Sequence, residues 1–252
     1  MPELPEVETT RRGIAPHVIG RRVARIDVYD SRLRWPVPGD LDACMRGRTI
    51  DRVDRRSKYL LFHAGEAALL VHLGMTGTLR VFRDAPTRRA HDHVDILLDN
   101  GTLLRYHDPR RFGAMLWLAA SREGHPLLDT LGPEPFDPQF DAGYLWRITR
   151  ARRAAIKLAL MDNHVVTGVG NIYANEALFR AGIHPGTRAS RLSKPRLGRL
   201  VARCATCCTR RLPKAAARCV TTSAPMVHRV ISSSTISFTD VPDKRAAFAA
   251  RP

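Results

Sequence analysis

The first half of the chain contains several strand-like apolar runs, and these predict a series of short β-strands. Asp99-Asn100-Gly101 separates two apolar runs and is a strong signal for a hairpin turn. Because no helical pattern interrupts the series, we expect an antiparallel sandwich or barrel. The strand-like runs cover residues 21–30, 48–64, 67–83, 93–108 and 113–119.

A helical pattern precedes these strands, and further helical patterns follow them. Residues 6–15 predict a leading helix, because Pro5 suits a first turn and Pro16 lies just past the end. Beyond residues 131–137, which contain two prolines, the apolar period lengthens to that of a helix. The later helical runs cover residues 144–163, 171–182 and 193–203.

These patterns divide the chain into three parts and indicate the α+β class. We expect a β-sandwich domain with its leading helix over residues 1–133, and a helical domain over residues 134–202. The composition then changes: residues 201–252 contain no Gly, Glu, Trp or Tyr and a single leucine, Leu212. We call this change the seam. A basic tail of such composition, here residues 203–252, is typically disordered.

The charge balance favours a polyanionic partner. The chain has 41 Lys and Arg against 24 Asp and Glu, which gives a net charge of +17. Nucleic acid is the simplest partner for such a chain, although a merely adhesive basic surface has the same balance. No apolar run approaches the roughly 20 residues of a membrane span, and the N-terminus lacks a signal-peptide pattern. We therefore expect a cytoplasmic, monomeric protein that does not bind membranes.

The N-terminus carries the first candidate chemistry. Removal of the initiator methionine would leave Pro2 with a free secondary amine, and α-amino groups titrate near a pH of roughly 8. Such an amine attacks carbonyl-like carbons and forms a Schiff base, and Glu3 and Glu6 could move protons beside it. The alternative is that Pro2 and Glu3 only begin a helix.

Lys58 is the second candidate, because it shares a strand face with Leu60 and Phe62. A lysine that points toward an apolar interior loses solvation, which lowers the pKa of its amine and makes it a usable acid or base. In isolation, a lysine whose stem lies along the sheet while its head reaches water is the more ordinary interpretation.

Two further stretches suggest contacts with nucleic acid. In residues 107–113, Arg110 and Phe112 combine a phosphate ligand with an aromatic ring that can enter a base stack, and Met75 could be a further apolar wedge. Core aromatics beside a solvated arginine pair explain the same pattern. Two histidines flank Asp92, but no matching Cys/His set completes a metal site.

Residues 168–171 place two glycines before a predicted helix. Backbone N–H groups at such a helix start bind phosphate, so we expect a phosphate site there. Arg152, Arg153 and Lys157 on the preceding run would add phosphate contacts.

Taken together, these stretches resemble the formamidopyrimidine-DNA glycosylases, bacterial repair enzymes that remove oxidised purines such as 8-oxoguanine. The resemblance covers roughly residues 1–200, and the matching segments occur in the family's order. They are MPELPEVET, RLRWP, RRSKYLL, HLGMTG, HDHVD, DPRRFGA, LGPEP, LMDN and GVGNIYANEALF.

The resemblance implies a role for each candidate. Pro2 would be the nucleophile that attacks C1′ of the damaged nucleotide, with Glu3 as the adjacent general acid and Glu6 nearby, and Lys58 would donate a proton during β-elimination at the abasic site. The remaining residues would bind duplex DNA. The implied DNA contacts are His91, Arg110, Arg152, Lys157 and Asn171, and the implied trio that fills the space left by the flipped base is Met75, Arg110 and Phe112.

The resemblance also implies a fold and a cofactor. The fold is an N-terminal β-sandwich followed by a helix-two-turns-helix domain, here truncated, with DNA in the cleft between them. The family ends in a zinc ribbon with two Cys-x-x-Cys pairs. Residues 204–208 and Cys219 offer one tight cluster of cysteines and no second pair, so we expect neither the ribbon nor a bound zinc ion in this chain.

A one-base frameshift near residues 199–203 accounts for the seam. If GC-rich codons for the tail are read one base out of register, the genetic code permits a text that continues the family's second half and reaches CRVCGTP. Met226 followed by Val227 forces a glycine in that text, because methionine has a single codon. The chain then descends from a bifunctional glycosylase with lyase activity. The alternative is an inactive basic DNA-binding remnant of that enzyme.

Overall fold

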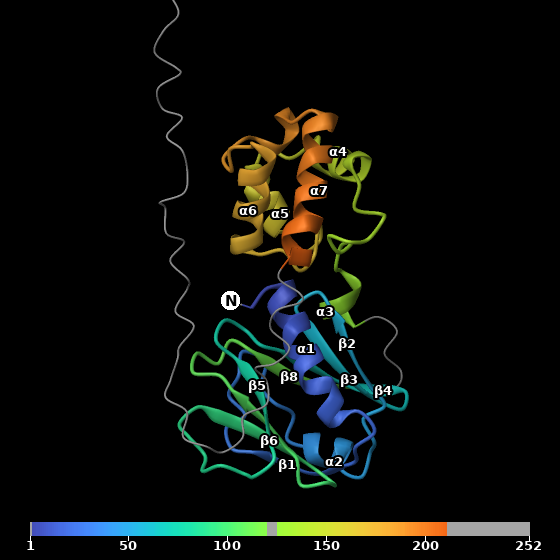
Figure 1. Cartoon of the computed structure of the whole chain (residues 1–252), viewed down its shortest axis with the longest axis vertical. Helices are drawn as coiled ribbons and strands as arrows, with labels where there is room; N and C mark the ends of the chain where they lie inside the picture. The colour runs from blue at the N-terminus through green and yellow to red at the C-terminus, as the bar shows by residue number, and fades with distance from the viewer. Residues whose placement is uncertain (1, 120–124, 211–252) are drawn as a thin grey trace, which may run out of the picture.

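The computed structural model describes residues 2–119 and 125–210, and all structural statements concern these ranges. A β-rich part and a helical part are stacked along the long axis of the molecule, and helix α1 (Leu4–Val18), which begins at their junction, runs along the β-rich part (Figure 1). Among the described residues, no helix combines the length and the apolar character that crossing a bilayer requires.

The β-rich part contains two antiparallel sheets of four strands each, which confirms the expected antiparallel arrangement. One sheet has the order β1-β6-β7-β5 and the other has the order β2-β3-β4-β8. The predicted turn at Asp99-Asn100-Gly101 joins β6 to β7, and Gly101 has the positive φ of 79° that such a turn requires. The strands are β1 Val23–Val28, β2 Arg52–Arg56, β3 Tyr59–Ala64, β4 Ala67–His72, β5 Thr78–Phe82, β6 Asp92–Leu98, β7 Leu103–His107 and β8 Ala114–Leu118.

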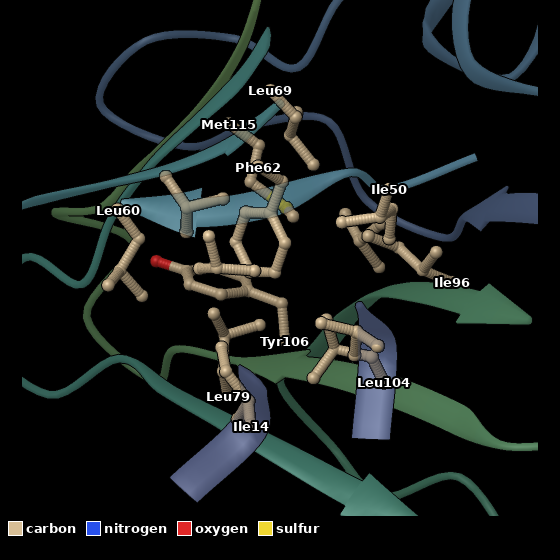
Figure 2. Close-up of a cluster of buried hydrophobic side chains, with 14 of the residues drawn as sticks. Ile14, Ile50, Leu60, Phe62, Leu69, Leu79, Ile96, Leu104, Tyr106 and Met115 are labelled. Atoms are coloured by element: carbon tan, nitrogen blue, oxygen red, sulfur yellow. The ribbon is translucent and has the colours of Figure 1, made fainter. Parts of the chain in front are cut away.

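Both sheets and the leading helix share one hydrophobic core. Tyr106 and Phe62, the largest fully buried side chains, come from different sheets and lie next to each other, with Ile14 of the leading helix beneath them (Figure 2). Burial of a side chain of this size contributes about 1.5–3 kcal/mol. The core therefore fixes the leading helix, and with it the N-terminus, against the sheets.

The leading helix, α1, runs from Leu4 to Val18 and is longer at both ends than the predicted 6–15. Glu3 and Glu6 form a capping box, in which each side chain bonds to the other's backbone, and Pro5 occupies the first turn as expected. Pro16 lies inside the last turn instead of past the end. The capping box starts the helix immediately after Glu3 and so defines where that side chain lies.

The second predicted helical run of the chain is divided in the structure. The run 144–163 forms two helices rather than one, because Ala155 is extended and pairs with Arg188 in an isolated bridge. The helices are α4 Ala142–Thr149, α5 Ile156–Met161, α6 Asn171–Ala181 and α7 Lys194–Arg210, with a short 3₁₀ turn at Ala189–Arg191. Two helices of one turn, α2 Leu41–Met45 and α3 Pro126–Asp129, are too short to show a period in the sequence.

The last helix passes through the seam. The predicted helical domain ends at residue 202, but residues 203–210 continue α7 without a break. Its apolar stripe also continues, because Cys204, Cys207 and Cys208 follow Leu197 and Leu200 into the core of the helical part. Thiols are small apolar groups and preserve this packing. The predicted disorder of the tail beyond residue 210 concerns residues outside those described.

Candidate active site at the junction of the two parts

Glu3 is held by the N-terminus of α6, a helix from the other part of the molecule. Its carboxylate accepts hydrogen bonds from the backbone N–H groups of Gly170 at 2.7 Å, Ile172 at 2.8 Å and Tyr173 at 3.2 Å. The side chain is only 2% exposed. A helix N-terminus attracts an anion through its free N–H groups and its dipole. In this structure the anion that these three N–H groups bind is the carboxylate of Glu3, and the phosphate site expected at residues 168–171 stays a prediction.

Two glycines make this close approach possible. A Cβ atom on Gly170 would lie 2.5 Å from Cδ of Glu3, and one on Gly168 would lie 2.6 Å from Cδ1 of Leu4. Gly168 also has a positive φ of 88°, and its carbonyl accepts the N–H of Leu4 at 3.0 Å. A side chain at either position would push α1 away from the loop before α6.

Pro2 and Glu6 complete this side of the site. Pro2 directly precedes Glu3 and is half-buried at the beginning of α1. Glu6 accepts the N–H of Glu3 at 3.0 Å through one oxygen and the hydroxyl of Tyr173 at 2.7 Å through the other. The predicted trio of Pro2, Glu3 and Glu6 therefore lies at the junction.

Lys58 reaches the same junction from the sheet. It lies in the two-residue loop between β2 and β3, not inside a strand as predicted, and its side chain is buried. Its Nζ donates to the carbonyl of Val169 at 3.2 Å. Burial lowers the pKa of the Lys58 amine, and the charge of Glu3 only partly opposes this. The amine is therefore available for proton transfer closer to neutral pH than an exposed lysine.

His72, at the end of β4, adds to the electrostatics around Lys58. Burial, together with the positive charges of Lys58 and Arg34, lowers the pKa of its imidazole to about 4. The ring is therefore neutral at physiological pH, and the charged group that acts on the Lys58 amine is Glu3.

A buried ion-pair network, which the sequence did not reveal, connects the sheet to the segment between the two parts. Arg55 donates to both oxygens of Glu134 at 2.8 Å and to Glu8 of α1 at 3.2 Å. Burial alone would raise the pKa of Glu8, but hydrogen bonds from Arg11 and Arg12 and the charges of Arg11 and Arg55 outweigh it and lower the pKa to about 2. The only signal of this network in the sequence was the charged Arg55, in a predicted strand that leads into an apolar run.

The predicted wedge residues lie on two loops that touch each other. Met75 and Phe112 are 38% and 42% exposed, so both side chains are accessible to a ligand. A Cβ atom on Gly74 would lie 2.5 Å from the backbone N of Gly113, so the loops pack backbone against backbone. The guanidinium of Arg110 lies over the Phe112 ring, 4.8 Å from its centre.

An open pocket borders these loops. It has a volume of about 520 Å³ and is lined by Arg32, Leu33, Arg34, Arg110, Arg111 and Phe112. Four of these six side chains are cationic, so the pocket suits an anionic or nucleotide-like ligand.

Of the remaining DNA-contact candidates, His91 and Asn171 are exposed, whereas Lys157 and Arg152 are half-buried. His91 lies close to the loop that carries Arg110 and Phe112, because its carbonyl accepts the N–H of Asp108 at 3.0 Å. Asn171 is exposed at the start of α6. Lys157 is half-buried on α5, and Arg152 donates to Asp162 at 2.7 Å, so its charge is shared with a carboxylate.

The described residues do not form a metal centre. Within residues 2–119 and 125–210, no group of three or more His, Cys, Asp or Glu side chains could hold an ion. His93 bonds to the carbonyl of Asp108, and Asp92 pairs with Arg105 and His107. The residue Cys219 lies outside the described part.

The three described cysteines of α7 do not fit zinc either. They lie in the core of the helical part, where burial raises the pKa of the Cys204 thiol and raises that of Cys208 to about 12. Zinc binds thiolates, and buried neutral thiols are poor ligands. We therefore derive no role for zinc from these residues.

Comparisons with known proteins agree on one family. The family profile described as the formamidopyrimidine-DNA glycosylase N-terminal domain matches residues 1–115, and that of the formamidopyrimidine-DNA glycosylase H2TH domain matches residues 131–219. The formamidopyrimidine-DNA glycosylase of Thioalkalivibrio sulfidiphilus is 60% identical over 202 residues, which are 80% of this chain and 74% of the relative. That of Methylococcus capsulatus is 56% identical over 196 residues, which are 78% of this chain and 72% of the relative.

Solved structures give the same result. The Lactococcus lactis enzyme, bound non-covalently to DNA that contains an abasic site, superposes with a TM-score of 0.77 at 31% identity, over 83% of this chain and 81% of that one. The Thermus thermophilus enzyme superposes with a TM-score of 0.73 at 38% identity, over 84% of this chain and 76% of that one.

Proposed function

Since the chain belongs to the formamidopyrimidine-DNA glycosylase family, we propose that Pro2, Glu3 and Lys58 carry its chemistry at the junction described above. The chain is a base-excision repair enzyme that releases oxidised purines from DNA and cleaves the strand at the abasic site that remains. The observation that carries the assignment of residues is the loop 167–170. Within this loop, the carbonyl of Val169 accepts a hydrogen bond from the Nζ of Lys58, and the N–H of Gly170 donates one to the carboxylate of Glu3.

Pro2 is the nucleophile in this proposal. Its imino nitrogen attacks C1′ of the damaged nucleotide, the bond from C1′ to the base breaks, and the departing base takes the proton of the amine. The C1′–O4′ bond then opens as the sugar oxygen takes a proton, so the sugar stays attached to the protein as an iminium ion. A secondary amine suits this step because it forms a cationic iminium, which withdraws electrons from the sugar. The chemistry needs a free amine at Pro2, so the initiator methionine has to be removed.

Glu3 and Lys58 move the protons. Glu3 has two oxygens with about four acceptor positions, and three are filled by N–H groups of α6, so one remains for a proton passed to the sugar oxygen. Lys58, with its lowered pKa, transfers protons during β-elimination at the abasic sugar. Glu6 keeps Glu3 in place through its backbone N–H.

Duplex DNA is the substrate, and we place it across the junction. His91, Arg110 and Asn171 have exposed positions from which they can contact phosphates, and Lys157 and Arg152 lie on the same helical part. Met75, Arg110 and Phe112 project from the paired loops and fill the space of the flipped nucleotide. The Lactococcus lactis relative, solved on abasic DNA, supports this arrangement.

Borohydride trapping tests the assignment of Pro2. The purified chain is incubated with abasic duplex DNA and sodium borohydride, which reduces the iminium to a stable cross-link. We expect a cross-link with the parent chain and with Pro16→Ala, which changes an exposed proline at the far end of the same helix. We expect none with Pro2→Gly or Glu3→Gln.

The same experiment separates the enzyme from a DNA-binding remnant. A remnant would bind the duplex with steep salt dependence and give no cross-link under any condition. Equal trapping by Pro2→Gly and the parent would instead show that another amine is the nucleophile. Mass spectrometry of the purified chain then decides whether the initiator methionine has been removed.

A further inference from the structure

Ser57, the residue before Lys58, has a backbone conformation that serine rarely adopts. Its φ is +57°, and it is the first residue of the two-residue loop between β2 and β3. In such loops the positive-φ position normally carries glycine, asparagine or aspartate. A side chain here is unfavourable unless its surroundings hold it, and such strain is concentrated at functional sites.

The surroundings hold all three polar groups of Ser57. Its N–H donates to Glu134 at 2.7 Å, its carbonyl accepts from Arg55 at 3.0 Å, and its hydroxyl accepts from the Thr167 hydroxyl at 2.5 Å. Glu134 belongs to the segment between the two parts, and Thr167 belongs to the helical part. Ser57 is therefore the point at which both parts and their connection meet.

The hydroxyl contact is buried and directed. Ser57 is 1% exposed, and Thr167 is not exposed at all. The N–H of Thr167 donates to the carbonyl of Pro133 at 2.9 Å, so the backbone that carries this hydroxyl is held as well. Glycine at position 57 would relieve the backbone but would leave the Thr167 hydroxyl without this partner, so the serine has a reason to be there.

The Ser57–Thr167 contact lies next to the bond that holds Lys58 in the proposed site. Thr167 bonds Ser57, and Val169, two residues later, bonds the Nζ of Lys58. The loop and the hairpin thus run side by side with two matched contacts. A shift of Ser57 would carry Lys58 away from the carbonyl of Val169, because the two residues share one short loop.

We propose that Ser57 and Thr167 are positioning residues, whose hydroxyl contact holds the hairpin loop so that the Lys58 amine meets the abasic sugar. The proposal rests on the proposed function of Lys58. It assigns no contact with DNA to either hydroxyl and concerns only where Lys58 is held.

Thr167→Val tests the proposal, because valine keeps the shape and removes the hydroxyl. We expect cleavage of a duplex with a preformed abasic site to slow at least about tenfold in single-turnover experiments. Binding of a duplex with a tetrahydrofuran residue should stay within about twofold, because no DNA contact changes. Thr167→Ser should restore the rate. Ser57→Ala should resemble Thr167→Val, and the double variant should be no slower than either.

Thr149→Val is the matched control. Thr149 is equally buried in the helical part, but its hydroxyl bonds to the carbonyl of Leu145 in its own helix at 2.7 Å. We expect this variant to cleave at the parent rate. If it slows cleavage as much as Thr167→Val does, the effect is general destabilisation and the proposal is wrong.

The titration of Lys58 gives a second readout that a structural role would not change. The chain contains five lysines, so the ε-carbon of Lys58 can be followed by NMR in ¹³C-lysine-labelled protein and assigned with Lys58→Met. Glu3 and His72 face this amine. If Thr167→Val exposes the Lys58 amine to water, the midpoint of the Lys58 titration should rise by about 0.5 pH units or more toward that of an exposed lysine.

These outcomes separate the two proposals. An unchanged Lys58 titration in Thr167→Val, or an unchanged cleavage rate, overturns the positioning role. Parent-like cleavage by Lys58→Met overturns the proposed function of Lys58 instead. If the parent chain does not cleave abasic DNA, the titration alone decides whether Thr167 positions the amine.

Discussion

Replacement of Gly170 by alanine should displace Glu3 without straining the backbone. The residue has φ −127° and ψ −158°, an extended conformation that alanine adopts freely. The new methyl group would lie 2.5 Å from Cδ and 2.6 Å from Oε1 of Glu3. Carbon atoms pack at about 3.5–4.0 Å, so the carboxylate has to move by about 1 Å.

The cost follows from the hydrogen bonds that this movement breaks. Glu3 accepts three N–H groups of α6, and a bond to a charged group contributes about 1.5–3 kcal/mol. Loss of one or two of these bonds costs about 3 kcal/mol. If the same geometry serves the reaction, base release should fall about 100-fold.

Single-turnover release of 8-oxoguanine from a duplex, together with a thermal melt, measures both effects. Gly198→Ala is the control, because a Cβ atom there meets Cβ of Ala142 at an ordinary 3.6 Å and the site is inside α7. That variant should be equally active and about 0.5–1 kcal/mol more stable. Base release by Gly170→Ala within about threefold of the parent would refute the reasoning, because it would mean that Glu3 need not sit on the helix N-terminus.

Three other predictions concern acid stability, thiols and the gene. The pKa of Glu8 lies near 2 in the fold and near 4.5 as a free group, so its stabilisation is fully present above pH 4.5 and is lost as the pH falls toward 2. Solvent screens part of this interaction, so acid titration of the unfolding free energy should show a loss of about 1–2 kcal/mol, and Glu8→Gln should not show it. In a Cys219→Ser variant, a thiol reagent should modify the half-exposed Cys44 first and should reach Cys204 and Cys208 only when the protein unfolds. If Cys204 and Cys208 were labelled as rapidly as Cys44, their place in the core would be contradicted. Sequencing of the gene should allow the family's second half to be read one base out of register beyond the seam, and third bases that forbid this reading would eliminate the frameshift.

The sequence predicted what is local. The strand-like apolar runs were enough for the strands, and the hairpin at Asp99-Asn100-Gly101 follows from the conformational freedom of Gly101. The candidates Pro2, Glu3 and Lys58 followed from the chemistry of their side chains and from the resemblance to a family. Both kinds of inference need only residues that are neighbours in sequence.

The sequence did not predict what depends on distant partners. The helix break at Ala155 arises from a bridge to Arg188, and the carboxylate that fills the N-terminus of α6 comes from Glu3, 167 residues before Gly170. Arg55 and Glu134 are 79 positions apart, and nothing in either local pattern indicates that they meet. Periodicity carries no information on such pairs, because it records only which face of an element is buried.

The docking of Glu3 onto α6 has a consequence for how this enzyme can be recombined. In a chimera that joins the β-sandwich of one relative to the helical part of another, each relative contributes some of the residues at the junction. Such a hybrid should fold from any compatible pair, yet turn over only when residues 2–6 and 167–173 come from partners whose surfaces fit each other. In the proposed function, the catalytic unit that is inherited is thus the junction between the two parts, and neither part retains it alone.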